Sequence, residues 1–352
     1  MTRSNTALIA AATLSAATYA CSALGLSAAE TAAAPQTTAV AAQTEISVAQ
    51  CAQRFPLIVQ NMCEIETISF ASTEGISEDQ GITWRLVDKQ TRFTADIKNK
   101  IFKTTEISYP FAPRQERKYM EYANIDGQHI RYYGDSAEDE KDVFHPKNVK
   151  KFHGTIQHGG RNIFEDSSFF YFFLFNDGKT RINEVFSNPQ LSSRVKIREH
   201  KSEGIVSIYT EGGVRFDFDT ATGRLSKRVV EIYSELKKGP SDYFIVQADG
   251  YFERNGQFFP KVLIKRYAHP PLDKRMSYGK RVSRITIHPD SFEVNKKYVP
   301  ADFSIVFPAG TPVYHEQKGL FGKIEQSMSS IDIPSIVSHL TEITARRQKE
   351  KK

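Results

Sequence analysis

The stretch KYMEYANIDGQHIRYY, residues 118–133, decides the fold. It places Asp126-Gly127 between two runs of strand-forming residues. An Asp-Gly pair suits the positive φ angles of a two-residue hairpin turn. The stretch therefore predicts two antiparallel strands, residues 118–124 and 128–133, joined by a tight turn.

The same pattern recurs along most of the chain. Apolar and polar residues alternate in residues 82–86 and 93–97, as in a strand with one buried face. Turn residues separate further strand-like runs at 204–209, 214–219, 224–234, 243–254, 257–267, 281–288 and 291–295. So many consecutive hairpins predict a mainly β protein built on one curved antiparallel sheet or a barrel.

Helices are expected in two segments. Between residues 48 and 65 apolar residues recur at three- and four-residue steps, which predicts a helix that Pro56 either kinks or starts. A second helix is predicted from Ile333 to about Lys349, within a charged tail over residues 326–352. Residues 30–47 are rich in Ala, Thr and Gln and predict a disordered leader, so that the folded domain covers residues 48–325.

The N-terminus has the pattern of a secretory signal peptide over residues 1–29. Arg3 is followed by an uncharged run from Ala7 to Leu26, and small residues precede Glu30. We expect cleavage and a periplasmic or secreted protein. Two alternatives remain: the run could stay as a membrane anchor, or Cys21 could carry a lipid that tethers the chain to the envelope.

Two cysteines then remain in an oxidising compartment. Cys51 and Cys63 are candidates for a disulfide, provided that Pro56 folds the segment back. In one straight helix they would lie about 18 Å apart, too far to bond. The alternative is two buried thiols.

Composition and charge describe an ordinary globular protein. The chain has 40% hydrophobic and 25% charged residues and a net charge of +6, with part of the excess in the C-terminal tail. The charge is scattered and lacks the basic stripe of a nucleic-acid binder. We therefore expect no nucleic acid among its partners and a weak contact with anionic membrane surfaces.

No motif predicts catalysis, a cofactor or a metal. His153 and His158 stand in a Gly-rich segment, which we interpret as a polar loop rather than a metal site. Asp217 and Asp219 alternate with Phe216 and Phe218, which predicts that the two carboxylates lie on the solvent face of a strand. The seven bulky residues from Phe169 to Phe175 predict a segment with both faces buried, or with one face against a ligand or partner.

The C-terminal half carries a resemblance. Tyr251, Asn255-Gly256, Phe258-Phe259-Pro260 and Tyr267, then Phe292 to Asn295, then Phe307-Pro308-Ala309-Gly310-Thr311, resemble the closing strands of the outer-membrane lipoprotein-sorting (LolA/LolB-like) superfamily. The helix that begins at Val48 and the strand near Ile65 to Phe70 suit its opening. The similarity covers residues 48–75 and 205–320, and residues 135–200 form a region without counterpart, which could be an insertion.

The resemblance implies a curved half-barrel with covering helices and an apolar cavity that holds acyl chains. The arginine that latches the lid of the compact carriers matches no residue here. Apolar residues of alternating strands are the candidates for the lining: Trp84, Phe93, Met120, Tyr122, Ile130, Tyr132, Phe216 and Phe218.

Three functions remain open. The chain could bind a lipid or an acylated lipoprotein, as a carrier or sensor without catalysis. It could be an envelope interaction module without a ligand. Less expected is a hydrolase whose site is assembled from residues far apart in the sequence.

Overall fold

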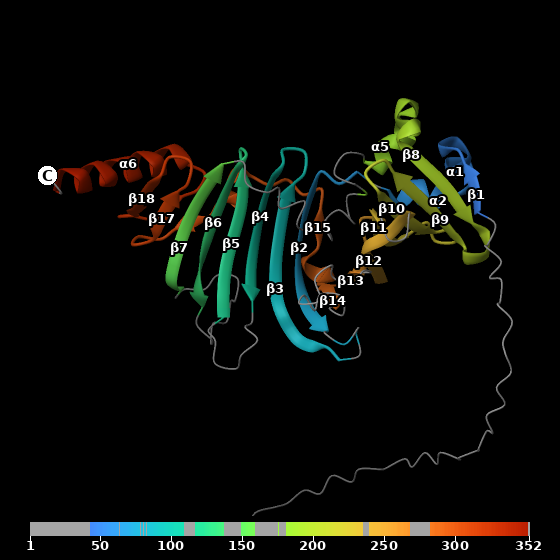
Figure 1. Cartoon of the computed structure of the whole chain (residues 1–352), viewed down its shortest axis with the longest axis horizontal. Helices are drawn as coiled ribbons and strands as arrows, with labels where there is room; N and C mark the ends of the chain where they lie inside the picture. The colour runs from blue at the N-terminus through green and yellow to red at the C-terminus, as the bar shows by residue number, and fades with distance from the viewer. Residues whose placement is uncertain are drawn as a thin grey trace, which may run out of the picture. The chain divides into compact units, whose positions relative to one another are not determined.

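A computed structural model describes residues 43–62, 64–77, 79, 81, 83–108, 117–136, 149–158, 175, 181–234, 239–267 and 282–350 (Figure 1). The chain divides into two units, residues 1–40 and 41–352, and all described residues belong to the second. The predicted signal peptide lies outside the described residues.

The second unit is mainly β. Its strands are β1 (Gln43–Ile46), β2 (Thr67–Ser77), β3 (Arg85–Asp96), β4 (Ile101–Ser108), β5 (Arg117–Ile125), β6 (Gln128–Ser136), β7 (Lys150–His158), β8 (Val195–His200), β9 (Ile205–Thr210), β10 (Val214–Asp219), β11 (Leu225–Ser234), β12 (Gly239–Arg254), β13 (Gln257–Tyr267), β14 (Val282–Ile287), β15 (Glu293–Val294), β16 (Val306–Phe307), β17 (Pro312–His315), β18 (Leu320–Lys323) and β19 (Met328–Ser329). Its α-helices are α1 (Val48–Arg54), α2 (Pro56–Asn61), α5 (Ile182–Ser187) and α6 (Ile333–Glu350). Short 3-10 helices span η1 (Pro189–Arg194), η2 (Lys201–Glu203), η4 (Pro289–Ser291) and η5 (Pro300–Phe303).

Seventeen strands form one sheet. Hydrogen-bonded neighbours run in the order β1, β8, β9, β10, β11, β12, β13, β14, β2, β3, β4, β5, β6, β7, β17 and β18. The seventeenth strand, β15, pairs with β2 on the same side as β14. All pairs are antiparallel except β7 with β17. The prediction of a mainly β protein built on a curved antiparallel sheet with covering helices is thus confirmed (Figure 1).

Two predicted hairpins close with the expected turns. Asp126 and Gly127 have φ angles of 51° and 73° between β5 and β6, and Asn255 and Gly256 have 53° and 75° between β12 and β13. Two positive φ angles in a row give a turn whose twist matches that of the strands it joins. The two turns therefore fix the register of their strand pairs.

The end of the predicted meander is arranged differently from a hairpin. β14 and β15 do not pair with each other; both pair with β2, near its opposite ends. Ser291, between them, accepts the backbone N–H of Ala71 at 2.8 Å through its hydroxyl oxygen. The late strands β14 and β15 therefore pair with the early strand β2. This pairing joins two arms of the sheet, one from β14 back to β8 and β1, the other from β2 through β7 to β17 and β18.

The buried face of the sheet changes at β4. Buried and partly exposed residues alternate along β4 up to Thr104, which is buried. Thr105 is buried as well, and beyond it the alternation continues with the buried side chains on the other face. Phe102 and Ile107 are both fully buried. They are five residues apart, so they point to opposite faces. We call the face of Phe70, Phe93 and Phe102 face A, and the face of Ile107, Ile130 and Tyr132 face B.

The helices and the leader deviate slightly from the predicted boundaries. The predicted helix over residues 48–65 is two short helices, because it breaks at Phe55 before Pro56, which starts α2. The predicted C-terminal helix is confirmed as α6. Residues 43–46, placed by the sequence in a disordered leader, form β1 by pairing with the charged edge of β8. None of the helices in the described part combines the length and apolar character needed to cross a bilayer.

Face B is covered by the C-terminal segment through a close approach at Gly154. A Cβ atom on Gly154 would lie 2.6 Å from Cε1 of Phe307 and 2.9 Å from Cγ2 of Val313. We expect Gly154→Ala to lower the free energy of unfolding by about 1–3 kcal/mol, because the ring and the strand must shift to admit a methyl group. Urea denaturation measures this change. His153→Ala changes the exposed neighbour and should stay within about 0.5 kcal/mol. Equal stability of the two variants would contradict this packing.

Candidate ligand site

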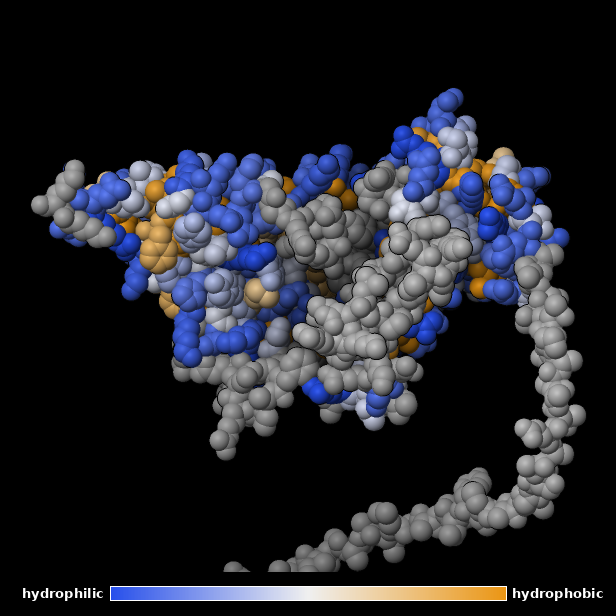
Figure 2. Space-filling view, in the orientation of Figure 1, coloured by the Kyte–Doolittle hydropathy of each residue, from blue (hydrophilic) through white to orange (hydrophobic). Residues whose placement is uncertain are grey.

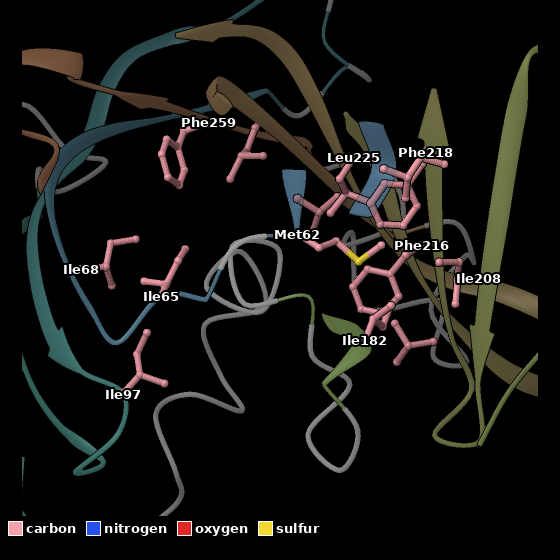
Figure 3. Packing of buried hydrophobic residues seen from close by; sticks show 14 of the residues in the cluster. Met62, Ile65, Ile68, Ile97, Ile182, Ile208, Phe216, Phe218, Leu225 and Phe259 are labelled. Carbon is pink, nitrogen blue, oxygen red and sulfur yellow. The ribbon is translucent and has the colours of Figure 1, made fainter. Parts of the chain in front are cut away.

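Face A carries the larger of the two apolar clusters in the described part of the chain. This principal cluster has 29 buried residues, against 13 in the second cluster on face B. Figure 3 shows side chains converging from β2, β10, β11 and β13 and from the neighbourhood of α2 and α5. The labelled ones are Met62, Ile65, Ile68, Ile97, Ile182, Ile208, Phe216, Phe218, Leu225 and Phe259. Both arms of the sheet therefore contribute to one interior.

Aromatic rings form a continuous series within the principal cluster. Phe70 lies 5.5 Å from Phe93 and 6.0 Å from Phe292, measured between ring centroids. Phe292 in turn lies 4.5 Å from Phe259. Ring pairs at these separations add attraction beyond the area that they bury. The series thus links β3 and β2 to β13 across the junction of the two arms.

Three short helices cover the principal cluster. α1 buries only Cys51, α2 only Ile58, and α5 only Ile182 and Val185. A helix of six or seven residues gains little from its own hydrogen bonds, so tertiary contacts must hold it in place.

Polar contacts attach α1 and α2 to the sheet. Nη2 of Arg54, in α1, donates to both carboxylate oxygens of Glu199 in β8, at 2.6 and 2.7 Å. A reciprocal capping box between Ser47 and Gln50 closes the start of α1. The turn at Gly223 abuts α2 so tightly that a Cβ atom there would lie 2.3 Å from the carbonyl carbon of Leu57. A few contacts at the ends of the helices therefore hold the cover.

The predicted aromatic run reaches this cluster at its last residue. Phe175 is the one member of Phe169–Phe175 within the described residues, and its ring stacks on Phe218 at 6.1 Å. Its carbonyl oxygen accepts the backbone N–H of Ile182 at the start of α5. The run therefore leads into the cover of the principal cluster.

The eight predicted lining residues divide among different environments. Phe93, Phe216 and Phe218 lie together in the principal cluster, whereas Ile130 and Tyr132 lie in the second cluster on face B. Met120 and Tyr122 are half-buried on face A outside both clusters, and Trp84 is half-buried beside the turn at Gly81. The structure thus brings three of the eight together.

Several members of the principal cluster were missing from that prediction. Phe70 lies in β2 and Phe259 in β13, where the alternation of each strand could have identified them as buried. Phe292 lies between η4 and β15, outside any strand. Ile58, Met62, Ile182 and Val185 come from the covering segments. No strand periodicity signals these four residues.

Charged groups border the apolar interior on face A. Lys89 Nζ lies 2.9 Å from Glu106 and 3.9 Å from Glu74, on strands adjacent to β3. Burial lowers the pKa of Lys89, but the two carboxylates outweigh it and raise the pKa overall. Arg228 is 4% exposed and pairs in register with Phe216, so its side chain starts on face A as well. The apolar interior therefore has a charged margin at Lys89 and one buried arginine, Arg228, in register between Phe216 and Val246.

Two sequence predictions about polar residues are wrong. Asp217 is buried rather than on a solvent face: the Ser207 hydroxyl donates to it at 2.7 Å, and Arg215 Nε lies 3.1 Å away. A carboxylate can be buried when such partners satisfy its oxygens. His153 and His158 lie on β7 rather than in a loop. The described residues contain no group of three His, Cys, Asp or Glu side chains that could hold a metal ion.

Only one cysteine of the predicted disulfide lies within the described residues. Cys51, a residue of α1, is fully buried, and burial raises the pKa of its thiol to about 11, with Arg54 opposing the shift. Cys63 lies outside the described residues. The bond therefore stays a prediction.

Comparison with known proteins gives a distant likeness only. No protein-family model matches the sequence, and no curated protein matches it. The structure is similar to a crystal structure of a LolA superfamily protein from Nitrosomonas europaea, with 8% identity, a TM-score of 0.34, and coverage of 73% of this chain and 96% of that one. It is also similar to a DUF1329 family protein from Desulfovibrio piger, with 8% identity, a TM-score of 0.30, and coverage of 71% and 95%. The first belongs to the superfamily that the sequence resembles.

Proposed function

We propose that this protein binds an acyl chain, from a lipid or an acylated lipoprotein, in the principal cluster, as a carrier or sensor of the cell envelope without catalysis. One observation carries the proposal. The largest apolar cluster of the described chain is covered by three helices of six or seven residues that bury one or two side chains each.

Such a cover opens more easily than the sheet beneath it. Segments with few buried contacts open locally at a lower free-energy cost than core strands. Opening α1, α2 or α5 displaces the buried Cys51, Ile58, or Ile182 and Val185. Of the partly buried side chains packed against the cluster, Val48 leaves with α1 and Phe186 with α5. The hydrogen-bonded strands of the sheet can stay intact while the apolar interior becomes accessible.

The chemistry of the interior suits an acyl chain. Transfer of an acyl chain from water stabilises the complex by about 0.8 kcal/mol per CH₂ group, so no directed polar contact is needed along its length. The charged margin of Glu74, Lys89 and Glu106 lies on the same face as Phe93, and the Lys89 side chain is 29% exposed. A polar head group could stay hydrated there while its chain is buried.

A ligand-free interaction module is the second candidate. In its favour, protein side chains alone bury Phe70, Phe102, Phe216 and Phe218 to 1% exposure or less. In this alternative the cover is permanent, and the cluster only stabilises the fold. Binding measurements separate the two candidates.

Ala248→Leu tests whether the interior admits a chain. Ala248 is half-buried against the principal cluster, and the larger side chain would occupy space that an acyl chain needs. We expect wild-type protein to bind a fluorescent fatty acid and the variant to bind it at least about tenfold more weakly, as for a loss of roughly 1.4 kcal/mol. Titration with the fluorescent probe, and its displacement by unlabelled fatty acid, measures the affinity.

Met120→Ala provides the matched control for this titration. Met120 is half-buried outside both clusters, so its truncation should leave the affinity unchanged. A thermal melt of each variant checks that the fold persists. Absence of probe binding by folded wild-type protein would refute the proposal. If Ala248→Leu bound the fluorescent fatty acid as tightly as wild-type protein, the ligand would not occupy the principal cluster.

The thiol of Cys51 reports on the cover. In a folded Cys21→Ser/Cys63→Ser variant at pH 8, we expect iodoacetamide to react with Cys51 at least about a hundredfold more slowly than in the same variant unfolded in urea. The reason is that a pKa raised from 9.0 to about 11 lowers the thiolate fraction at pH 8 by about that factor. The neutral thiol also favours the folded state, and this contribution is lost as the pH rises from about 9 to about 11. Mass spectrometry follows the labelling. Reaction at the unfolded rate would show that α1 does not shield the cluster.

A further inference from the structure

Face A continues beyond the principal cluster as a row of five aligned side chains, of which Arg131, Tyr314 and Phe321 are exposed. Residues directly opposite each other on neighbouring strands point to the same face. The register aligns Tyr122, Arg131 and Thr155 on β5, β6 and β7, and then Tyr314 and Phe321 on β17 and β18. We call these five residues the aromatic–arginine row. With strands about 4.8 Å apart, it extends for about 20 Å.

The row is open to solvent where it leaves the interior. Tyr314 is 40% exposed and Phe321 is 50% exposed, and Arg131 is exposed. Their neighbours along β17 and β18, Val313 and Gly322, turn the other way and pack in face B, where Val313 is fully buried and Gly322 faces Leu340 of α6. Figure 2 shows hydrophobic colour over the β17–β18 hairpin of Figure 1, surrounded by hydrophilic residues.

Cations along the row are held by rings. The guanidinium carbon of Arg131 lies 5.3 Å from the ring centre of Tyr122, and that of Arg347 lies 5.8 Å from the ring centre of Phe321. Arg347 also donates to the Phe321 carbonyl oxygen at 3.3 Å. Within the described part of the chain, neither arginine forms an ion pair with a carboxylate. Both rings therefore orient positive charge at the surface.

The carboxylates near the row are already neutralised. Glu106 lies with Lys89, and Asp135 lies with Lys118 and Lys151. A second pair of exposed rings, Tyr133 and His153, stacks at 5.5 Å one register step away. This part of face A thus combines exposed rings with two arginines, Arg131 and Arg347, that have no carboxylate partner among the described residues.

From this combination we propose that the aromatic–arginine row is a docking surface for an anionic membrane. Tyrosine and phenylalanine rings are stable at the head-group level of a bilayer, and arginine beside them is attracted to anionic lipids. A broad sheet face matches a lipid surface without a complementary partner shape. The proposal does not depend on the acyl-binding function, but it would place the open end of face A against the membrane.

Sedimentation with vesicles tests the proposal on the full chain. The vesicles contain phosphatidylcholine alone or an equal mixture of phosphatidylcholine and phosphatidylglycerol. We expect wild-type protein to bind the anionic vesicles preferentially. Arg131→Gln/Arg347→Gln should weaken this binding by about fivefold for each arginine, and Tyr314→Ala/Phe321→Ala should also weaken it. All variants share the same N-terminal segment, so its contribution cancels.

Matched controls carry the same changes elsewhere on the surface. Lys98→Gln/Lys196→Gln removes two exposed cations outside the row, and Val299→Ala truncates a side chain that is 52% exposed. Both controls should bind anionic vesicles as wild-type protein does. Equal binding to both kinds of vesicle, or equal losses in the control variants, would overturn the proposal. The proposal also fails if the row variants keep vesicle binding and lose only an acidic protein partner.

The fluorescent fatty-acid titration, run on the same variants, separates this proposal from the proposed function. We expect the row variants to retain wild-type affinity for the fatty acid. Vesicle binding without fatty-acid binding would refute the acyl site and leave the docking surface. Fatty-acid binding without vesicle binding would refute the docking surface and leave the acyl site.

Discussion

The architecture depends on one constraint: side chains alternate between the two faces of a strand, and β4 contributes buried side chains to both faces. On β4, Phe102 is buried on face A and Ile107 on face B, because burial repeats at Thr104 and Thr105. One continuous sheet can therefore support two apolar clusters on opposite faces. Beyond β4 the alternation also leaves face A to polar and aromatic side chains such as Tyr122 and Arg131.

The two clusters differ in how they are closed, and this difference carries the functional argument. On face B, α6 has 18 residues and buries Ile333, Ile336, Leu340 and Ile343. On face A, the larger cluster is covered by helices of six or seven residues. A cover that contributes few buried side chains can open without loss of the fold. The proposed acyl site and the cluster closed by the long helix α6 therefore lie on opposite faces of the same sheet.

The sequence predicts this fold where the controlling interactions are local. Asp126-Gly127 and Asn255-Gly256 fix their hairpins through backbone angles alone. The helix expected from Ile333 to about Lys349 is α6. Contacts between distant segments carry no such signal. The parallel pairing of Val313 with Gly154, the pairing of β14 and β15 with β2, and the burial of Asp217 beside Arg215 all depend on tertiary partners. For the same reason alternation identified Phe216 and Phe218 but could not separate face A from face B for Ile130.

Hydrogen exchange followed by mass spectrometry, with and without saturating fatty acid, tests the central claim most directly. We expect amides of α1, α2 and α5 to exchange faster than those of β2, β3, β12 and β13, because the cover opens locally while the sheet does not. We also expect the fatty acid to change exchange in these helices and in the strands beneath them. Protection of the three helices equal to that of the strands, unchanged by fatty acid, would contradict the claim that the cover opens to admit an acyl chain.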